Sequence, residues 1–370
     1  MRIVFLLWSI SSIATAIKND NKRNRPNATT LRTGTWLNPL GFDVVGAQDF
    51  RPVATRVFLD LWKHSTVLDD SNSIEQGQWP ITETSIPFYA HSIPKDVRAD
   101  IEGSFSAKFG GYPSKLPQFE MWSTERHSSV VATIGKGGAF IEAGVYFAQW
   151  KGKGTLSWEG DGAILSDKSI STMLEGITID TADTSNCAFL MLTPKEGLRV
   201  RIVKVGEEAN PVRDIQIYPY RYLKKLSAKN CATSSCLRSL IDSGTLPTFH
   251  PHFIEMLKET KILRFAGWQN VLPWESYGDK AGAAVFSDRT TIHSQTQAGP
   301  KGVAIEYMVE LANVLQADPW FSMPKAAATG PDVVDPYARA FANLTLTRLD
   351  AARKVYVEYR SCCYGTLAPG

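Results

Sequence analysis

The sequence lacks the charge imbalance and the long apolar runs that mark two large classes of protein. Forty lysine and arginine residues stand against 37 aspartate and glutamate residues, so the 370-residue chain has a net charge of +3. Such a near-neutral chain carries no electrostatic footprint for nucleic acid, and we expect no nucleic-acid partner. No segment after residue 16 approaches the ~20 consecutive apolar residues that span a bilayer, so we expect no membrane span.

Sequence motifs for metals and cofactors are also missing. The chain has no Gly-rich phosphate loop, no Cys-x-x-Cys pair and no Cys/His spacing typical of zinc sites. His250 and His252 flank Pro251 and superficially suggest a metal pair, but no third ligand lies near them in the sequence. We therefore expect a structural role for these histidines, no metal and no cofactor.

The first sixteen residues read as a secretory signal. Arg2 supplies a positive charge, residues 3–13 are apolar but too short to span a bilayer, and residues 14–16 form a small-x-small cleavage site. A short membrane anchor is the alternative. We expect a secreted, extracellular protein whose mature chain begins at Ile17.

Secretion permits disulfides and N-glycosylation. Cys231 and Cys236 bracket four residues and could close a small loop, or they could remain two free thiols in a linker. Asn27 and Asn343 each begin an N-glycosylation sequon. Asn27 lies in a polar tail, where a sequon is accessible, whereas Asn343 falls on a predicted helix, where modification is disfavoured.

The first two thirds of the chain divide into three parts. Residues 17–35 are polar and predict a disordered tail, and residues 36–100 predict an N-terminal segment that packs on the C-terminal domain. That segment has a strand-like stretch at 41–46 and helical spacing over 53–63. Residues 101–220 alternate between apolar and polar in short runs separated by turns, which predicts a jelly-roll-like β-sandwich. The alternating runs are 104–109, 145–150, 154–158, 176–180 and 198–205.

The period changes after a Lys/Ser/Cys-rich linker at 221–247. Helical and strand-like segments then alternate, as expected for a parallel (β/α) sheet. The predicted helices are 251–261, 303–315 and 337–349, and the predicted strands are 261–265, 319–323 and 355–359. A complete (β/α)8 barrel needs ~250 residues, about twice the length of the 248–359 segment. The fold class is thus α+β and multidomain, with a β-sandwich followed by an incomplete TIM-type barrel whose unpaired edge favours self-association.

Charged residues at the ends of the predicted strands are the candidates for catalysis and for substrate positioning. Arg264 lies in an apolar strand and needs a partner there, either as a positioner of substrate or in a structural ion pair with Glu358. Glu358 and Glu306 are weak catalytic candidates, because glycoside hydrolysis commonly uses two carboxyl groups. Glu306 also has a structural explanation, since an acidic residue in the first turn of a helix complements its dipole.

Aromatic and amide side chains near the same strand ends predict a polysaccharide partner. Trp268, Trp274 and Trp320 could each stack on a sugar ring, and core packing is the alternative for each of them. Asn270 follows the Arg264 strand and is a candidate for binding a sugar hydroxyl.

Three blocks of sequence carry a resemblance to a known family. They lie at 210–215, at 249–253 with 263–268, and at 302–321 with 355–359. Together they resemble secreted glycoside-hydrolase-like proteins, often labelled cellulose-binding-domain proteins. The resemblance implies a β-sandwich followed by a catalytic barrel of the clan of retaining (β/α)8 glycosidases, acting on polysaccharide.

The resemblance also implies that the catalytic machinery is absent. In that family the strand that corresponds to 355–359 continues as Ser-Asn-Glu, and the Glu is the acid/base. This chain has Arg360, Ser361 and Cys362 there, and the family's nucleophile would lie beyond Gly370. We therefore expect an aberrant C-terminus at 360–370, a truncated product of a frameshift, a retained intron or a premature stop, and no catalytic residue intact. The alternative function is a non-catalytic extracellular carbohydrate-binding protein.

Overall fold

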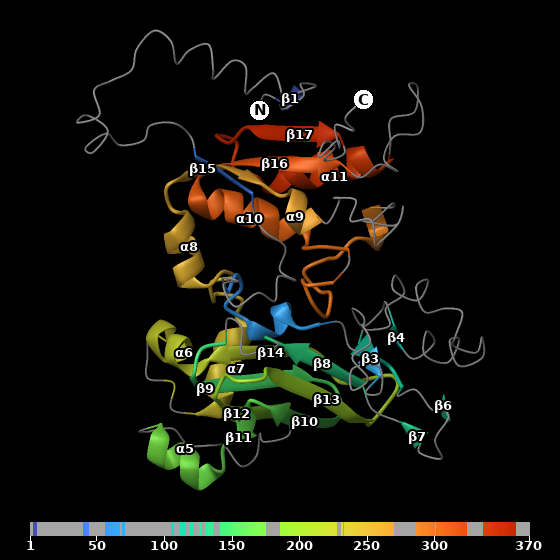
Figure 1. Ribbon diagram of the computed structural model, residues 1–370, viewed down its shortest axis with the longest axis vertical. Helices are drawn as coiled ribbons and strands as arrows, with labels where there is room; N and C mark the ends of the chain where they lie inside the picture. Colours follow the sequence, from blue (N-terminus) through green and yellow to red (C-terminus); the bar gives the residue numbers. More distant parts are fainter. Residues whose placement is uncertain are drawn as a thin grey trace, which may run out of the picture. The chain divides into compact units, whose positions relative to one another are not determined.

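A computed structural model gives the fold of the chain in two compact units (Figure 1). The parallel-sheet unit contains Met1–Gly46, Met256–Arg289 and Ala304–Gly370, and the antiparallel-sheet unit contains Ala47–Glu255 and Thr290–Val303. The structure describes residues 3–5, 40–43, 56–66, 69–70, 105–106, 112–115, 119–120, 126–127, 130–135, 141–174, 186–227, 231, 233–269, 286–299, 301–323 and 336–359.

The antiparallel-sheet unit contains two four-stranded antiparallel sheets, in the orders β10-β13-β8-β3 and β11-β12-β9-β14. Two short hairpins, β4-β5 and β6-β7, accompany them. The strands are β3 (Asp69–Asp70), β4 (Phe105–Ser106), β5 (Tyr112–Pro113), β6 (Phe119–Glu120), β7 (Arg126–His127), β8 (Val130–Ile134), β9 (Gly144–Lys151), β10 (Gly154–Gly160), β11 (Gly162–Ile164), β12 (Cys187–Leu192), β13 (Leu198–Val205) and β14 (Arg213–Pro219). The predicted strands at 145–150, 154–158 and 198–205 are confirmed, and 176–180 lies outside the described residues.

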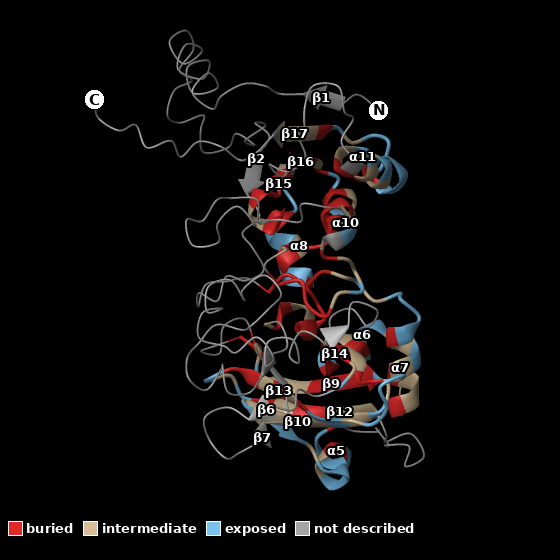
Figure 2. Cartoon of the chain, turned by 90° about the vertical axis from the view of Figure 1, so that its right-hand side faces the viewer, coloured by how far each residue is buried: buried red, intermediate tan, exposed pale blue. Residues whose placement is uncertain are grey.

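Strand β9 separates two hydrophobic cores. Successive side chains of a strand point to opposite faces, so Tyr146 and Ala148 enter one core while Phe147 enters the other. The first core joins the two sheets, since it also contains Val200 of β13 and Leu190 of β12. Strand β9 is buried on both faces for this reason, as its coloured ribbon shows (Figure 2).

Three short helices form the far side of the second core. They are α5 (Asp167–Met173), α6 (Tyr220–Leu226) and α7 (Ser234–Asp242), and they contribute Ile170, Leu223, Leu237 and Ile241. The predicted linker at 221–247 is therefore wrong, because it contains most of α6 and all of α7. The two helices span only two turns each, so their apolar side chains form no extended periodic pattern.

The described residues 56–66 and 69–70 of the N-terminal segment belong to the antiparallel-sheet unit, whereas residues 40–43 of the same segment form a strand of the parallel-sheet unit. Trp62 lies in the first core and Leu59 in the second, so the prediction that 36–100 packs on the C-terminal domain is wrong for these residues. The helix predicted over 53–63 is also wrong for the described residues 56–63, where the 3₁₀ helix η2 (Leu61–His64) forms after an extended stretch. Asp60 explains where it starts, because its carboxylate accepts hydrogen bonds from the backbone N–H groups of Trp62 and Ile217.

The parallel-sheet unit is built on five parallel strands in the order β1-β17-β16-β15-β2. Strands β2 to β17 follow the chain order, and the predicted strands near 261, 319 and 355 are confirmed. Within the described residues the sheet is open rather than a closed barrel. The strands are β1 (Ile3–Phe5), β2 (Leu40–Asp43), β15 (Thr260–Arg264), β16 (Asp318–Met323) and β17 (Val355–Tyr359), and the helices are α8 (Pro251–Leu257, across the boundary of the two units), α9 (Ala266–Gln269), η7 (Phe286–Asp288), α10 (Ile305–Leu315) and α11 (Pro336–Arg348).

Segments of the two units alternate along the chain. The predicted single boundary at 247/248 does not describe this order. Strand β2 precedes the whole antiparallel-sheet unit, and Thr290–Val303 returns to that unit after β15. Hydrogen bonds hold the returning segment: the Gln295 amide donates to Ser65 Oγ (2.9 Å), and the Gln297 backbone N–H donates to the Lys63 carbonyl (3.0 Å). These contacts join residues more than 200 positions apart, and no local sequence pattern signals them.

Candidate functional site

Five side chains share one face of β15, β16 and β17: Arg264, Ser322 and Glu358 lie at the carboxyl ends of their strands, and Trp320 and Tyr356 lie two residues before Ser322 and Glu358. The strand register places Arg264 beside Trp320 and Trp320 beside Tyr356, and two residues further on it places Ser322 beside Glu358. Because side chains alternate along a strand, these five residues point to the same side of the sheet. We call them the strand-end cluster.

The opposite face of the same strands is a hydrophobic core. Phe321 lies between Ser322 and Trp320 in sequence, and its ring contacts Phe341 of α11 with centroids 4.9 Å apart. Phe265, which follows β15, stacks on Phe321 at 5.5 Å. The helices therefore bury one face of the sheet, and the polar and aromatic side chains gather on the other.

Arg264 and Glu358 form an ion pair at the centre of the cluster. Arg264 donates to Glu358 Oε1 from Nη2 (2.6 Å) and from Nε (3.1 Å), and the Ser322 hydroxyl donates to the same oxygen (2.6 Å). The side chains of Arg264 and Glu358 remain 24% and 17% exposed, so a ligand can reach them. The ion pair anticipated from sequence is present, and it leaves the cluster accessible.

Gln269 of α9 hydrogen-bonds to the backbone of β16 next to the cluster. Its Oε1 accepts a hydrogen bond from the backbone N–H of Ser322 (2.6 Å), which fixes the strand beside Glu358. Gln269 is 6% exposed, and its Nε2 has no hydrogen-bond partner among the described residues. Sequence reasoning missed Gln269, although its position just after a strand end was an available signal.

Two aromatic rings lie beside the ion pair. The Arg264 guanidinium carbon is 5.6 Å from the centroid of the half-buried Trp320 ring, and the Tyr356 ring is 6.3 Å from Trp320 on the next strand. Sequence reasoning missed Tyr356, whose two-residue spacing from Glu358 in a strand places both on one face. The pair offers apolar surface next to hydrogen-bonding groups, as sugar recognition requires.

The other predicted sugar-stacking residues do not join this cluster. The prediction that Trp268 stacks on a sugar ring is wrong, because Trp268 is 1% exposed and packs beside Phe265 with ring centroids 5.6 Å apart. A fully buried ring presents no face to a ligand. Asn270 and Trp274 lie outside the described residues.

Glu306, the second candidate carboxylate, pairs with a different arginine. Its Oε1 accepts a hydrogen bond from Arg289 Nη2, and the Arg289 guanidinium lies over the Phe286 ring at 4.1 Å. Glu306 is 9% exposed in the first turn of α10, where it also complements the helix dipole. Each candidate carboxylate is thus tied to its own arginine.

His250 and His252 lie at the start of α8 and are joined there by a hydrogen bond. His250 Nδ1 accepts a hydrogen bond from the His252 backbone N–H at the start of α8 (3.3 Å). Burial, reinforced by the positive charge of Arg56, lowers the pKa of His250 to about 4. An imidazole used in this way has a structural role.

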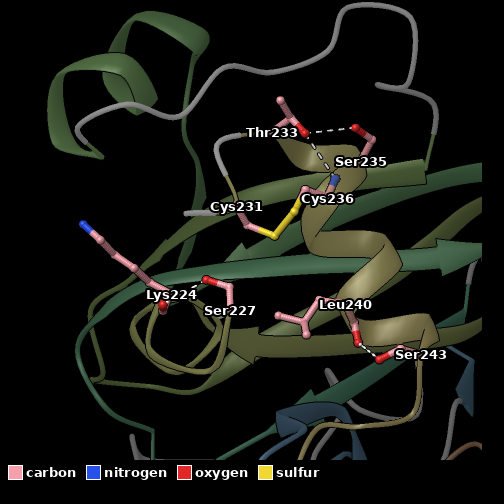
Figure 3. The surroundings of a disulfide bond; sticks show 8 residues. All are labelled: Lys224, Ser227, Cys231, Thr233, Ser235, Cys236, Leu240 and Ser243. Atoms are coloured by element: carbon pink, nitrogen blue, oxygen red, sulfur yellow. Dashed lines mark hydrogen bonds between the residues drawn. A yellow bond between two sulfur atoms is a disulfide. The ribbon is translucent and has the colours of Figure 1, made fainter. Parts of the chain in front are cut away.

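Cys231 and Cys236 form a disulfide at the N-terminus of α7, beside the Thr233 hydroxyl that caps the helix (Figure 3). Asn343 is exposed on α11, but the hydroxyl of its sequon partner Thr345 is buried and donates to the Phe341 carbonyl (2.9 Å). The Asn27 sequon lies outside the described residues. The folded helix therefore presents Asn343 without its sequon hydroxyl.

Comparisons of the chain with family models, with curated proteins and with solved structures found no match. Among the described residues, no group of three His, Cys, Asp or Glu side chains is arranged to hold a metal ion. In the same part of the chain, no helix has the length and apolar character to cross a membrane. Function is therefore inferred from the geometry of the strand-end cluster.

Proposed function

We propose that this chain is a secreted, glycoside-hydrolase-like protein that binds polysaccharide at the strand-end cluster without cleaving it. The observation that carries the proposal is the Arg264–Glu358 ion pair, with Ser322 bonded to it and Trp320 beside it, at the carboxyl ends of parallel strands. Ligand sites of parallel α/β folds lie at this edge.

The arrangement of the strands supports a fold related to a TIM-type barrel. Strands β2, β15, β16 and β17 are neighbours in chain order and parallel, as the first strands of such a barrel are. Two antiparallel sheets that share a core support a β-sandwich in the other unit. We place the chain in a sandwich-plus-partial-barrel class on these grounds.

The chemistry of the cluster supports binding rather than hydrolysis. Hydrolysis of a glycosidic bond commonly needs one carboxyl group to donate a proton and a second to act as nucleophile or base. Glu358 is held by Arg264 and Ser322, Glu306 is held by Arg289, and residues 360–362 are Arg, Ser and Cys. We infer that the cluster retains groups that position a sugar and lacks the pair that would cleave it.

Secretion is part of the proposal. The Cys231–Cys236 bond supports it, because disulfides persist in oxidising extracellular compartments and are rare in the cytosol. The apolar leader before residue 17 points the same way.

Replacing Trp320 with alanine should weaken binding to insoluble polysaccharide about fivefold to thirtyfold. Loss of an aromatic platform removes ~1–2 kcal/mol of contact with the sugar ring. Pull-down on cellulose, chitin and alginate, followed by assay of released reducing ends, measures both binding and cleavage.

Trp158→Ala is the matched control for this substitution. Trp158 is a half-buried tryptophan on β10, in the antiparallel-sheet unit, where it contacts Trp150. We expect it to leave binding unchanged once folding has been checked by thermal melting. A loss from Trp158→Ala without a loss from Trp320→Ala would place the glycan on the antiparallel-sheet unit instead. Release of reducing ends by the wild type would refute the non-hydrolytic assignment.

We also propose that the mature chain pairs with a second copy through the edge of β17. The edge is filled by β1, whose residues Ile3–Phe5 pair with residues 355–357 and lie within the predicted signal. Removal of residues 1–16 would leave the β17 backbone groups unpaired, which favours strand addition. Sedimentation equilibrium should find dimers for a chain that starts at Ile17 and fewer for residues 1–370; a monomeric short chain would end this proposal.

A further inference from the structure

We propose that the strand-end cluster selects neutral polysaccharides over acidic ones. This inference rests on the proposed function and adds the substrate class to it. It follows from the charge and the hydrogen-bonding capacity of the side chains that surround Glu358.

The cluster has no surplus positive charge with which to attract an anionic polymer. At the carboxyl ends of β15, β16 and β17, its described side chains carry one cation, Arg264, and one anion, Glu358, in direct contact. The backbone register also places an acidic residue, Asp43 at the end of β2, beside Arg264. An incoming carboxylate would have to compete with Glu358 for Arg264 and would be repelled by it.

The hydrogen-bonding capacity of the cluster gives the same preference. An ionised carboxylate only accepts hydrogen bonds, a guanidinium only donates them, and a sugar hydroxyl does both. A hydroxyl can therefore donate to Glu358 and accept from Arg264 at once, whereas the carboxylate of a uronic acid can only accept. Trp320 and Tyr356 add apolar surface that suits the C–H face of any sugar ring and does not discriminate by charge.

Glu358→Gln tests the inference by removing one negative charge with little change of shape. Its Oε1 can still accept from Arg264, but the guanidinium is no longer neutralised. We expect retention on alginate, a polyuronate, to rise about threefold to tenfold relative to retention on cellulose or another neutral polymer. The gain should disappear at ~1 M salt, where the screening length falls to ~3 Å.

The chain offers a matched control for this substitution. Glu159 of β10 accepts hydrogen bonds from Arg201 Nε (2.7 Å) and Nη2 (3.1 Å), so it forms the same kind of ion pair in the antiparallel-sheet unit. Glu159→Gln should leave the ratio of alginate to neutral-polymer binding unchanged. The double variant Arg264→Gln/Glu358→Gln removes both charges and should return the ratio toward the wild-type value.

The possible outcomes separate this inference from the proposed function. Wild-type protein that is retained on none of the polymers would refute the proposed function itself. Wild-type protein that prefers alginate, or a folded Glu358→Gln variant with an unchanged ratio, would overturn the charge selection while leaving polysaccharide binding intact. If Glu358→Gln does not fold, the retention of the wild type on neutral and acidic polymers still tests the charge selection. We expect its binding to neutral polymers to be stronger than its binding to alginate and insensitive to salt.

Discussion

Replacing Gly152 with alanine should reduce the free energy of unfolding of the antiparallel-sheet unit by about 3–5 kcal/mol, the sum of backbone strain and overpacking. Gly152 lies in the turn between β9 and β10 with a φ of +84°, and a Cβ there would lie 1.8 Å from the Pro211 carbonyl oxygen. The turn has little freedom to move away, because the Lys153 N–H donates to the Asn210 carbonyl (2.8 Å).

A second glycine separates the clash from the backbone strain. Gly244 also has a positive φ, +66°, but a Cβ there would meet no atom within 4 Å. Gly244→Ala should therefore cost only about 1 kcal/mol, the ordinary penalty of a left-handed conformation. Urea denaturation of the two variants checks the difference, and equal losses would show that the Gly152 turn relaxes around the methyl group.

The sequence predicts the strands of this protein better than it predicts how they assemble. Strand β13 was predicted with its observed bounds because it alternates between apolar and polar from Leu198 to Ile202 and stays rich in β-branched residues to Val205. Strand β17 was predicted with its bounds because it is an isolated, largely apolar run. These signals are local. The division of the chain into units is not local, since β2 and the segment Thr290–Val303 each join elements that are distant in sequence.

The candidate site shows the same division between local and distant information. An arginine in an apolar strand predicts an acidic partner, and the pair with Glu358, 94 residues later, was one of two alternatives for Arg264 that the sequence left open; the structure contains that pair. The burial of Trp268 and the support from Gln269 depend on how α9 turns after β15. Tryptophan is equally suited to a core and to a sugar site, so the residue type alone could not separate Trp268 from Trp320.

Acidification should destabilise the antiparallel-sheet unit through two buried histidines. Burial, together with the positive charge of Arg56, lowers the pKa of His64 from 6.5 to about 3 and that of His250 to about 4. Above pH 6.5 both imidazoles are neutral in the folded and unfolded states, so their titration does not change the free energy of unfolding. Below pH 6.5 the unfolded chain binds protons that the folded chain excludes, and stability falls until the folded-state pKa is reached.

The contribution of His64 at pH 4.5 should be about 3 kcal/mol, because two pH units separate that pH from the unfolded-state pKa. His250 acts in the same direction. Asp60 acts in the opposite direction, since burial raises its carboxyl pKa and protonation of that carboxyl as the pH falls favours the folded state. Comparing variants at one pH cancels the Asp60 contribution.

Between pH 7 and pH 4.5, the free energy of unfolding should fall by about 3 kcal/mol less for His64→Gln than for the wild type, because the variant lacks the imidazole that excludes a proton. The reason is that the glutamine carbonyl can replace His64 Nε2 as the acceptor of the Phe58 backbone N–H, without a titrating group. Urea denaturation at both pH values measures the slopes. Equal slopes for wild type and His64→Gln would mean that the His64 imidazole accepts its proton within the fold, and that its hydrogen bond with Phe58 is not maintained in acid.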